Sequence, residues 1–203
     1  MNRALYFVVL FSGLLFSCED SSSIKHTAGS KNITINLQPF NDLPNQYIEF
    51  VSTELRKVYP GVEINSGMAL PPASLNTAKT RYRADSLIKM LASHTKESHV
   101  TIGLTTKDIS TTKNKIKDWG VMGLGYCPGR ACVVSSFRLN PKNKKEQLFK
   151  VAIHELGHTQ GLQHCPVKTC FMRDAEGKNY LDAETEFCAK CRAHLIERGW
   201  DLK

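Results

Sequence analysis

The chain has 203 residues, of which 41% are apolar and 23% are charged, and its formal net charge is +8. This length allows one domain with a hydrophobic core, and this composition is typical of globular proteins, so wholesale disorder and a multi-span membrane protein are excluded. Much of the positive charge lies in two short runs, "KNKIK" and "PKNKK". Such runs are usually solvated loops, and we therefore expect no nucleic-acid partner.

The first 17 residues have the layout of an export signal. Arg3 provides a basic start, and an apolar run from residue 4 to about residue 16 ends in "LLFSC". The run is too short to cross a bilayer comfortably as a helix. Its end is similar to the lipobox of bacterial lipoproteins, in which the signal is cleaved before a cysteine that becomes lipidated. This similarity implies a lipid on Cys18 that anchors the protein to a membrane of the bacterial cell envelope. A plain secretory signal and an uncleaved anchor are the alternatives.

Residues 18–30 are polar and rich in serine, which is typical of a flexible tether between a lipid anchor and a folded domain. Loss of residues 1–17 would lower the net charge by one, to +7. The remaining residues, 31–203, are expected to form one domain that acts as a monomer.

From residue 31 onward, short apolar runs that suit strands alternate with amphipathic patterns that suit helices. Pro39 ends the first strand, and a pair of prolines near residue 71 interrupts both regular structures. The second helix is expected to bury Leu87, Met90 and Leu91. In chain order, the sequence predicts a strand at 32–40, a helix at 43–59, a short strand with an irregular loop at 61–76, a helix at 84–94 and a strand at 100–105.

Two apolar runs at 119–126 and 133–139 flank the turn sequence "CPGRAC". Proline and glycine favour turns, so the sequence predicts a hairpin whose strands begin and end at Cys127 and Cys132. The two thiols would then face each other near the turn, and an exported protein would join them in a disulfide. Two free thiols are the alternative.

A longer helix is predicted from about Asn143 to Gln160. Its apolar residues fall within one stripe at ~100° per residue, and the histidines avoid that stripe. His154 and His158 lie ~40° apart, one turn from each other, so both imidazoles can reach a single ion. Glu155 lies at the edge of the same site. It is therefore placed beside a metal without being an obvious ligand.

Gly161 explains how a third ligand reaches the ion. Glycine tolerates the left-handed conformation that ends helices, so the chain can turn there and bring His164 back toward the other two histidines. Three histidines leave the fourth tetrahedral position of Zn²⁺ for water, which is the pattern of a catalytic site. Glu155 would act as the general base, and such a site hydrolyses peptide bonds. The alternative is that the histidines are solvated surface residues.

Four cysteines follow the histidines. Cys165 and Cys170 are separated by four residues, and Cys188 and Cys191 by two, which suits a second zinc site with a structural role. Two disulfides are the alternative, because an oxidising compartment favours paired thiols. Met172 follows His164 closely enough to form a methionine-containing turn below the three-histidine site.

The stretches "HELGHTQGLQHC", "CFM" and "CAKC" together resemble the archaemetzincins, a branch of the metzincin zinc peptidases. The resemblance continues upstream through "INLQPF", "IGLTTKDI", "WGVMGLG" and "VVSSFRL". It implies an α+β fold with a mixed twisted sheet, an active-site helix and a small cysteine-rich C-terminal part that ends in a helix at 188–200. It also implies the site residues. They are His154, His158 and His164 for catalytic zinc, Glu155 as the base, Met172 in the turn, and Cys165, Cys170, Cys188 and Cys191 for a second zinc.

The sequence thus predicts a zinc-dependent peptidase whose partners are a peptide or protein substrate and a membrane reached through Cys18. In metzincins an edge strand pairs with the extended substrate, and here that strand is 133–139 or its hairpin partner. Tyr126, Tyr180 and Arg173 are possible substrate contacts, although each is also an ordinary surface or core residue by type. A catalytically silent, zinc-stabilised binding lipoprotein is the alternative function.

Overall fold

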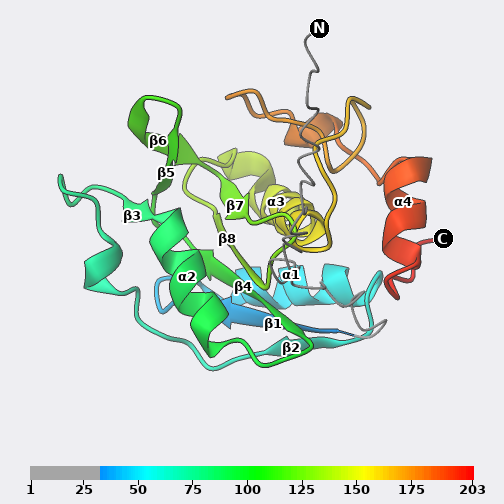
Figure 1. The fold of residues 1–203 in the computed structure, drawn as a ribbon, viewed down its shortest axis with the longest axis horizontal. Helices are drawn as coiled ribbons and strands as arrows, with labels where there is room; N and C mark the ends of the chain where they lie inside the picture. Colours follow the sequence, from blue (N-terminus) through cyan, green and yellow to red (C-terminus); the bar gives the residue numbers. More distant parts are fainter. Residues whose placement is uncertain (1–32) are drawn as a thin grey trace, which may run out of the picture.

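A mixed five-stranded sheet with helices on both faces forms the body of the protein (Figure 1). The computed structural model describes residues 33–203, so the predicted signal, Cys18 and the whole predicted tether lie outside the described residues. Within residues 33–203, no helix has the length and apolar character needed to cross a membrane. The strands are β1 (Thr34–Pro39), β2 (Val62–Ile64), β3 (Tyr82–Arg83), β4 (His99–Thr105), β5 (Ile109–Lys113), β6 (Ile116–Val121), β7 (Gly123–Gly125) and β8 (Ala131–Ser135).

The sheet has the strand order β2-β1-β4-β8-β7, in which only the edge strand β7 runs antiparallel to its neighbour. Side chains alternate across a strand, and β8 shows this clearly. Cys132 and Val134 face the larger core, whereas Ala131 and Val133 face the smaller one. The larger core contains side chains of α1 and α3, and the smaller core contains those of α2.

Within the described part of the chain, four α-helices and three short 3-10 turns complete the fold. The prediction for α2 matches the structure at both ends, and the other helices are shorter than predicted by one to four residues at an end. Within α2, Ile88 is fully buried and Met90 only partly, so the predicted set of buried residues was wrong at that position. The helices are α1 (Asn45–Arg56), α2 (Ala84–His94), α3 (Lys144–Thr159) and α4 (Ala189–Ile196), and the 3-10 turns are η1 (Pro72–Ser74), η2 (Pro141–Asn143) and η3 (Leu181–Ala183).

A second sheet of three strands, in the order β3-β5-β6, was not predicted from the sequence. The basic run "KNKIK" lies at the turn between β5 and β6, where alternation of apolar and polar residues is absent. Residues 119–121 belong to β6 and residues 123–125 to β7, so the predicted first hairpin strand is divided between the two sheets. The second predicted strand also differs, because β8 covers residues 131–135 and ends before Phe137.

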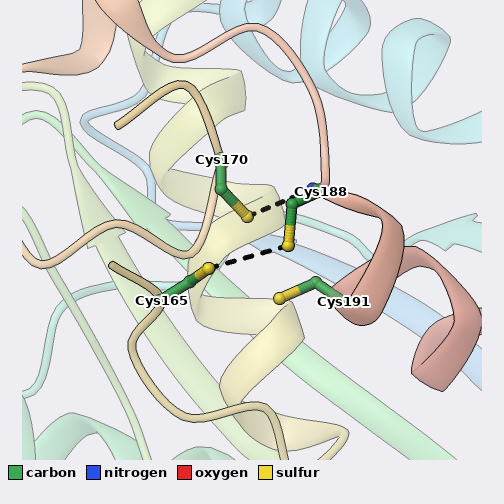
Figure 2. Close-up of side chains that lie close together, drawn as sticks. All are labelled: Cys165, Cys170, Cys188 and Cys191. Atoms are coloured by element: carbon green, nitrogen blue, oxygen red, sulfur yellow. Dashed lines mark hydrogen bonds between the residues drawn. The ribbon is translucent and has the colours of Figure 1, made fainter. Parts of the chain in front are cut away.

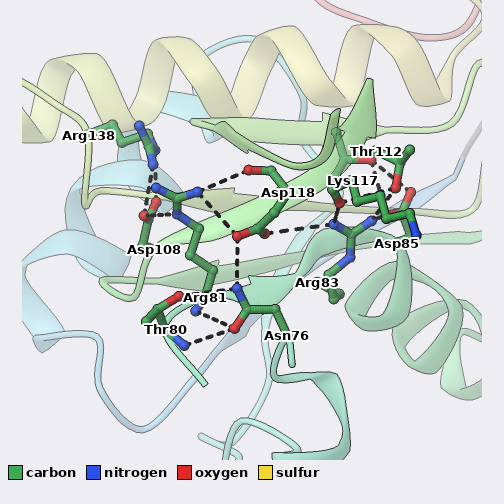
Figure 3. Close-up of polar contacts among 11 residues, drawn as sticks. Asn76, Thr80, Arg81, Arg83, Asp85, Asp108, Thr112, Lys117, Asp118 and Arg138 are labelled. Atoms are coloured by element: carbon green, nitrogen blue, oxygen red, sulfur yellow. Dashed lines mark hydrogen bonds and ion pairs between the residues drawn. The ribbon is translucent and has the colours of Figure 1, made fainter. Parts of the chain in front are cut away.

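Ion pairs join the second sheet to the rest of the domain (Figure 3). The buried carboxylate of Asp108 accepts hydrogen bonds from Arg81 Nε at 2.7 Å and from Arg138 Nε at 2.8 Å. Asp118 of β6 accepts one from Asn76 Nδ2 at 2.8 Å and a longer one from Arg81. Arg81 precedes β3, Asp108 precedes β5 and Arg138 follows β8. The network therefore fixes the hairpin of β5 and β6 relative to the central sheet.

The predicted disulfide between Cys127 and Cys132 is wrong, because both are free thiols. The strand register explains the difference, since Cys132 lies opposite Gly125 and Cys127 falls in the turn beyond the last paired residue. Cys132 is fully buried, whereas the Cys127 thiol points to the segment after α3 and donates a hydrogen bond to the Leu162 carbonyl at 3.2 Å.

Candidate active site

The long helix α3 ends where the sequence places its break. Gly161 has φ of +93°, a left-handed conformation that costs little for glycine and more for other residues. The Gly161 N–H donates to the His158 carbonyl at 2.9 Å, and the Leu162 N–H donates to the Gly157 carbonyl at 3.0 Å. These two bonds form a Schellman motif, which satisfies the last carbonyls of the helix and reverses the chain.

This reversal brings the three histidines together. One ring nitrogen from each of His154, His158 and His164 can be chosen so that all three lie within 4.8 Å of one another. The Nε2 atoms of His154 and His158 are 3.1 Å apart. Two of the rings come from one turn of α3 and the third from the segment after Gly161. The predicted geometry of this cluster is therefore present.

Hydrogen bonds determine which nitrogen of each helical histidine faces the cluster. His154 Nδ1 lies 2.6 Å from the Phe171 carbonyl, and His158 Nδ1 lies 2.7 Å from the Leu162 carbonyl. A carbonyl only accepts, so each Nδ1 carries the proton and each Nε2 presents a lone pair to the centre. Burial and the adjacent histidines lower the pKa of His154 to about 3, which keeps the ring neutral. Neutral rings with converging lone pairs are the donors that Zn²⁺ prefers, so the residues present fit zinc.

Glu155 is enclosed between α3 and the edge strand β7. It is 7% exposed, and burial raises the pKa of its carboxyl to about 8, while the backbone N–H of Gly125 opposes this shift. A Cβ atom on Gly123 would lie 2.6 Å from Glu155 Oε1, so only glycine leaves room for this approach. The glycines of "WGVMGLG" therefore let the strand lie directly against the carboxylate.

A tight turn at Cys170–Arg173 supports the histidines from the side. The Arg173 N–H donates to the Cys170 carbonyl at 2.9 Å, and Met172 inside the turn is fully buried. The Met172 sulfur packs against the backbone of α3 at Gly157, one residue before His158. A methionine-containing turn therefore lies next to the histidine cluster, as the sequence suggested.

The four late cysteines converge in a separate cluster (Figure 2). Their sulfur atoms all lie within 4.8 Å of one another, and the sulfurs of Cys165 and Cys188 are 3.6 Å apart. Burial opposes ionisation of Cys188, but hydrogen bonds from the Cys191 backbone and the other thiols lower its pKa to about 7. All cysteines within residues 33–203 are free. Four sulfurs around one point are the donor set of a structural zinc site, so these residues fit zinc as well.

A cleft of about 890 Å³ extends from the histidine cluster. One wall is formed by β6 and β7, another by α3, and a third by the segment from Arg173 to Glu184. Tyr180 and Arg173 line the cleft, with the Arg173 guanidinium 3.6 Å from the centre of the Tyr180 ring, whereas Tyr126 is exposed outside the lining. The edge strand beside the cleft is β7, and β8 is enclosed between β4 and β7.

Two residues of the site were missed in the sequence. The Asp174 carboxylate lies 3.5 Å from His164 Nδ1 and lines the same cleft. Glu184 is buried in the wall of the cleft. Neither residue belongs to a spaced motif, and both lie on a segment with little regular structure, so no periodic signal pointed to them.

Comparisons with known proteins identify the family. The sequence model of Peptidase family M54 matches residues 32–198. An archaemetzincin of Halobacterium salinarum is 30% identical over 172 residues, which cover 78% of this chain and 96% of the relative. Crystal structures of archaemetzincins are also similar. The one from Archaeoglobus fulgidus, complexed with malonate, has a TM-score of 0.69 and 27% identity, covering 80% of this chain and 99% of its own. The one from Methanopyrus kandleri has a TM-score of 0.70 and 26% identity, covering 83% and 96%.

These similarities extend over almost the whole length of each relative, and the predicted α+β fold is confirmed. The chain therefore belongs to Peptidase family M54, the archaemetzincins, and is a zinc metallopeptidase.

Proposed function

We propose that the protein hydrolyses peptide bonds at the histidine cluster, with Glu155 as the general base. The observation that carries this proposal is the side-by-side placement of three converging imidazole nitrogens and one buried carboxylate at the end of a cleft. His154, His158 and His164 would hold the ion. Zinc bound there supplies Lewis acidity, which polarises a peptide carbonyl and acidifies water.

The residues of this chain perform the remaining tasks. Glu155 takes a proton at its carboxylate and passes it to the amine that leaves, which is the usual work of a general base and acid. The cleft orients the peptide, and the free edge of β7 offers backbone groups to an extended chain. Asp174 and the Phe171 and Leu162 carbonyls hold the three rings in place.

Substitution of Glu155 by Gln tests the assigned base. The amide keeps the size of the side chain but cannot take the proton, so we expect cleavage of a peptide library to fall by roughly 10²–10⁴-fold. Mass spectrometry of the digest, with zinc content measured in the same samples, provides the readout. Glu176→Gln is the matched control, because Glu176 is an exposed carboxylate at the same cleft. Unchanged cleavage by Glu155→Gln would show that the base is another group.

We further propose that Cys165, Cys170, Cys188 and Cys191 hold a second zinc ion with a structural role. The four sulfurs would fill all four tetrahedral positions and leave none for a substrate. Metal analysis of the purified protein should then give about two zinc ions per chain. One zinc ion together with the loss of four titratable thiols would instead support two disulfides.

The sequence of the first 18 residues supports export and lipid anchoring as a separate proposal. Cys18→Ala should move the protein from the membrane fraction to the soluble envelope fraction, because several acyl chains at roughly 0.8 kcal/mol per buried methylene provide the anchor. Identical fractionation of the variant and the wild type would contradict lipidation.

A further inference from the structure

Glu184 is a buried carboxylate with no partner in the part of the chain that the structure describes. Its side chain lines the cleft, yet the residue is only 3% exposed. Its Oε2 atom is completely enclosed and has no hydrogen-bond partner among the described residues. Buried polar groups nearly always have hydrogen-bond partners, and a carboxylate without one carries a large desolvation cost. A buried carboxylate without hydrogen-bond donors in a substrate cleft indicates a ligand whose N–H or O–H groups donate to it.

The nearby cations are held by other groups. Lys150 Nζ donates to the Leu181 carbonyl at 2.7 Å, and the Arg173 guanidinium stacks on the Tyr180 ring at 3.6 Å. Neither donates a hydrogen bond to the enclosed Oε2 atom of Glu184. Burial raises the pKa of Glu184 to about 7, and the more distant charges of Lys150 and Arg173 oppose this shift. The charges of Lys150 and Arg173 therefore lower the desolvation cost of the Glu184 carboxylate, but neither residue donates a hydrogen bond to its Oε2 atom.

The position of Glu184 relative to the histidines is fixed by α3. Glu184 directly follows η3, whose Leu181 carbonyl accepts from Lys150 and whose Asp182 accepts from Gln147 Nε2 at 2.8 Å. Lys150 precedes His154 by four residues, or ~6 Å along a helix. Glu184 therefore lies in the wall of the cleft, on a segment that is held against the turn of α3 before His154. Glu184 and the three histidines line the same cleft, so a peptide bound there can contact both.

We propose that Glu184 is a specificity-determining residue that binds a cationic group of the substrate close to the bond that is cleaved. The group is a Lys or Arg side chain next to the scissile bond, or the free amino terminus of the peptide. Both present several N–H donors and a positive charge, and both satisfy a buried carboxylate in the same way. This inference rests on the proposed peptidase function of the cleft.

The first test uses the zinc-loaded wild-type protein and a peptide library in which each position carries Arg, citrulline, Lys or norleucine. Citrulline and norleucine keep nearly the same shape but lack the charge. We expect cleavage next to Arg or Lys to exceed cleavage next to its neutral analogue by roughly tenfold or more in kcat/KM. Equal cleavage of charged and neutral peptides, whether or not their amino termini are free, would overturn the proposal without any variant being made.

Acetylation of the peptide amino terminus distinguishes the two sources of positive charge. A preference for Arg and Lys that survives acetylation identifies the side chain as the bound group. A loss of cleavage on acetylation, with equal rates for Arg and citrulline, identifies the amino terminus. Each outcome supports a cationic subsite and assigns its occupant.

Glu184→Gln then connects the preference to this residue. The variant should lose the tenfold preference for charged over neutral peptides, because the amide can accept a hydrogen bond but carries no charge. Glu176→Gln, an exposed residue at the same cleft, should keep the preference unchanged. A preference that persists in Glu184→Gln would show that another residue binds the cation.

Binding separates a failure of this inference from a failure of the proposed hydrolysis. In the Glu155→Gln background, calorimetric titration with Arg and citrulline peptides measures affinity without turnover. If the wild type cleaves nothing and the Arg peptide still binds roughly tenfold more tightly, the subsite stands and the hydrolysis does not. If the wild type cleaves, and the Arg peptide, the citrulline peptide and their acetylated forms all bind equally, only the subsite fails.

Discussion

The two ligand clusters of this protein differ mainly in what surrounds them. The histidine cluster lies at the end of a cleft of about 890 Å³ with a buried carboxylate beside it. None of the four cysteines lines that cleft, and two of them, Cys170 and Cys191, are buried. Three ligands at an open position leave room for chemistry, whereas four ligands in a closed shell leave only a contribution to stability. The number of ligands and their access to the cleft, more than the metal, distinguish the two roles.

Cys191→Ser gives the largest expected effect on stability. If the four cysteines hold zinc as proposed, loss of one thiolate removes binding energy that is also folding energy, so the free energy of unfolding should fall by on the order of 5 kcal/mol. Urea denaturation together with zinc analysis measures this loss. His164→Ala is the comparison, because it should release the other zinc ion and abolish cleavage at a cost of only about 1 kcal/mol. An equal loss of free energy of unfolding in the two variants would contradict the view that only the cysteine cluster has a structural role.

Gly123→Ala should affect catalysis without affecting the cysteine cluster. The new methyl group would lie 2.6 Å from Glu155 Oε1, so the carboxylate must move. We expect kcat/KM to fall by roughly 10–100-fold, since displacement of a catalytic group by about 1 Å has effects of this size. The zinc content should stay the same. Gly61→Ala, which lies far from the cleft, is the control, and an unchanged rate in Gly123→Ala would mean that the position of Glu155 does not depend on β7.

Gly161→Ala tests the chain reversal that brings His164 to the cluster. The added Cβ has space, because its nearest neighbour is His194 at 3.8 Å, so the effect comes from the left-handed backbone alone. The free energy of unfolding should fall by about 1–2 kcal/mol, and zinc should be lost from the histidine cluster first. Gly161→Asn should lose less stability and less zinc than Gly161→Ala, because asparagine adopts the left-handed conformation more easily than alanine. Equal losses would point to a cause other than backbone conformation.

Glu184→Gln should give the smallest effect, and one that depends on pH. The pKa of Glu184 is raised from 4.5 to about 7, so the folded state holds the proton more tightly than the unfolded state. The wild type therefore loses stability as pH rises through this range, and the variant does not. The difference in free energy of unfolding between variant and wild type should grow in favour of the variant between pH 4.5 and 7. Urea denaturation at several pH values measures this difference, and a constant difference would mean that folding leaves the pKa of Glu184 unchanged.

The sequence predicted those parts of the site that depend on local spacing. His154 and His158 share a helical turn, Gly161 ends that helix, and Cys165 follows His164 directly, so a short stretch of chain determines most of the geometry. Periodicity also predicted the helices well, and α2 matches at both ends. These features require only the regular geometry of a helix and the conformational freedom of one glycine.

The rest depends on contacts between distant segments. The register of β7 and β8 places Gly125, not Cys127, opposite Cys132, so the two cysteines do not form the disulfide expected from the hairpin. The hairpin of β5 and β6 has a basic, weakly alternating sequence, and its place is fixed by ion pairs such as Arg81 with Asp108. Glu184 follows a 3-10 turn whose position depends on Lys150. No pattern within a single element contains this information.

The turn at Cys170–Arg173 belongs to both clusters. It provides the Cys170 sulfur to one of them and, through the Phe171 carbonyl, the acceptor for His154 in the other. Damage to either cluster is therefore transmitted through a span of four residues. We therefore expect an oxidant or alkylating reagent that modifies Cys170 to displace the Phe171 carbonyl and with it His154, and so to reduce hydrolysis. A competitive inhibitor bound in the cleft should not prevent this loss, because the thiols of the cysteine cluster do not line the cleft.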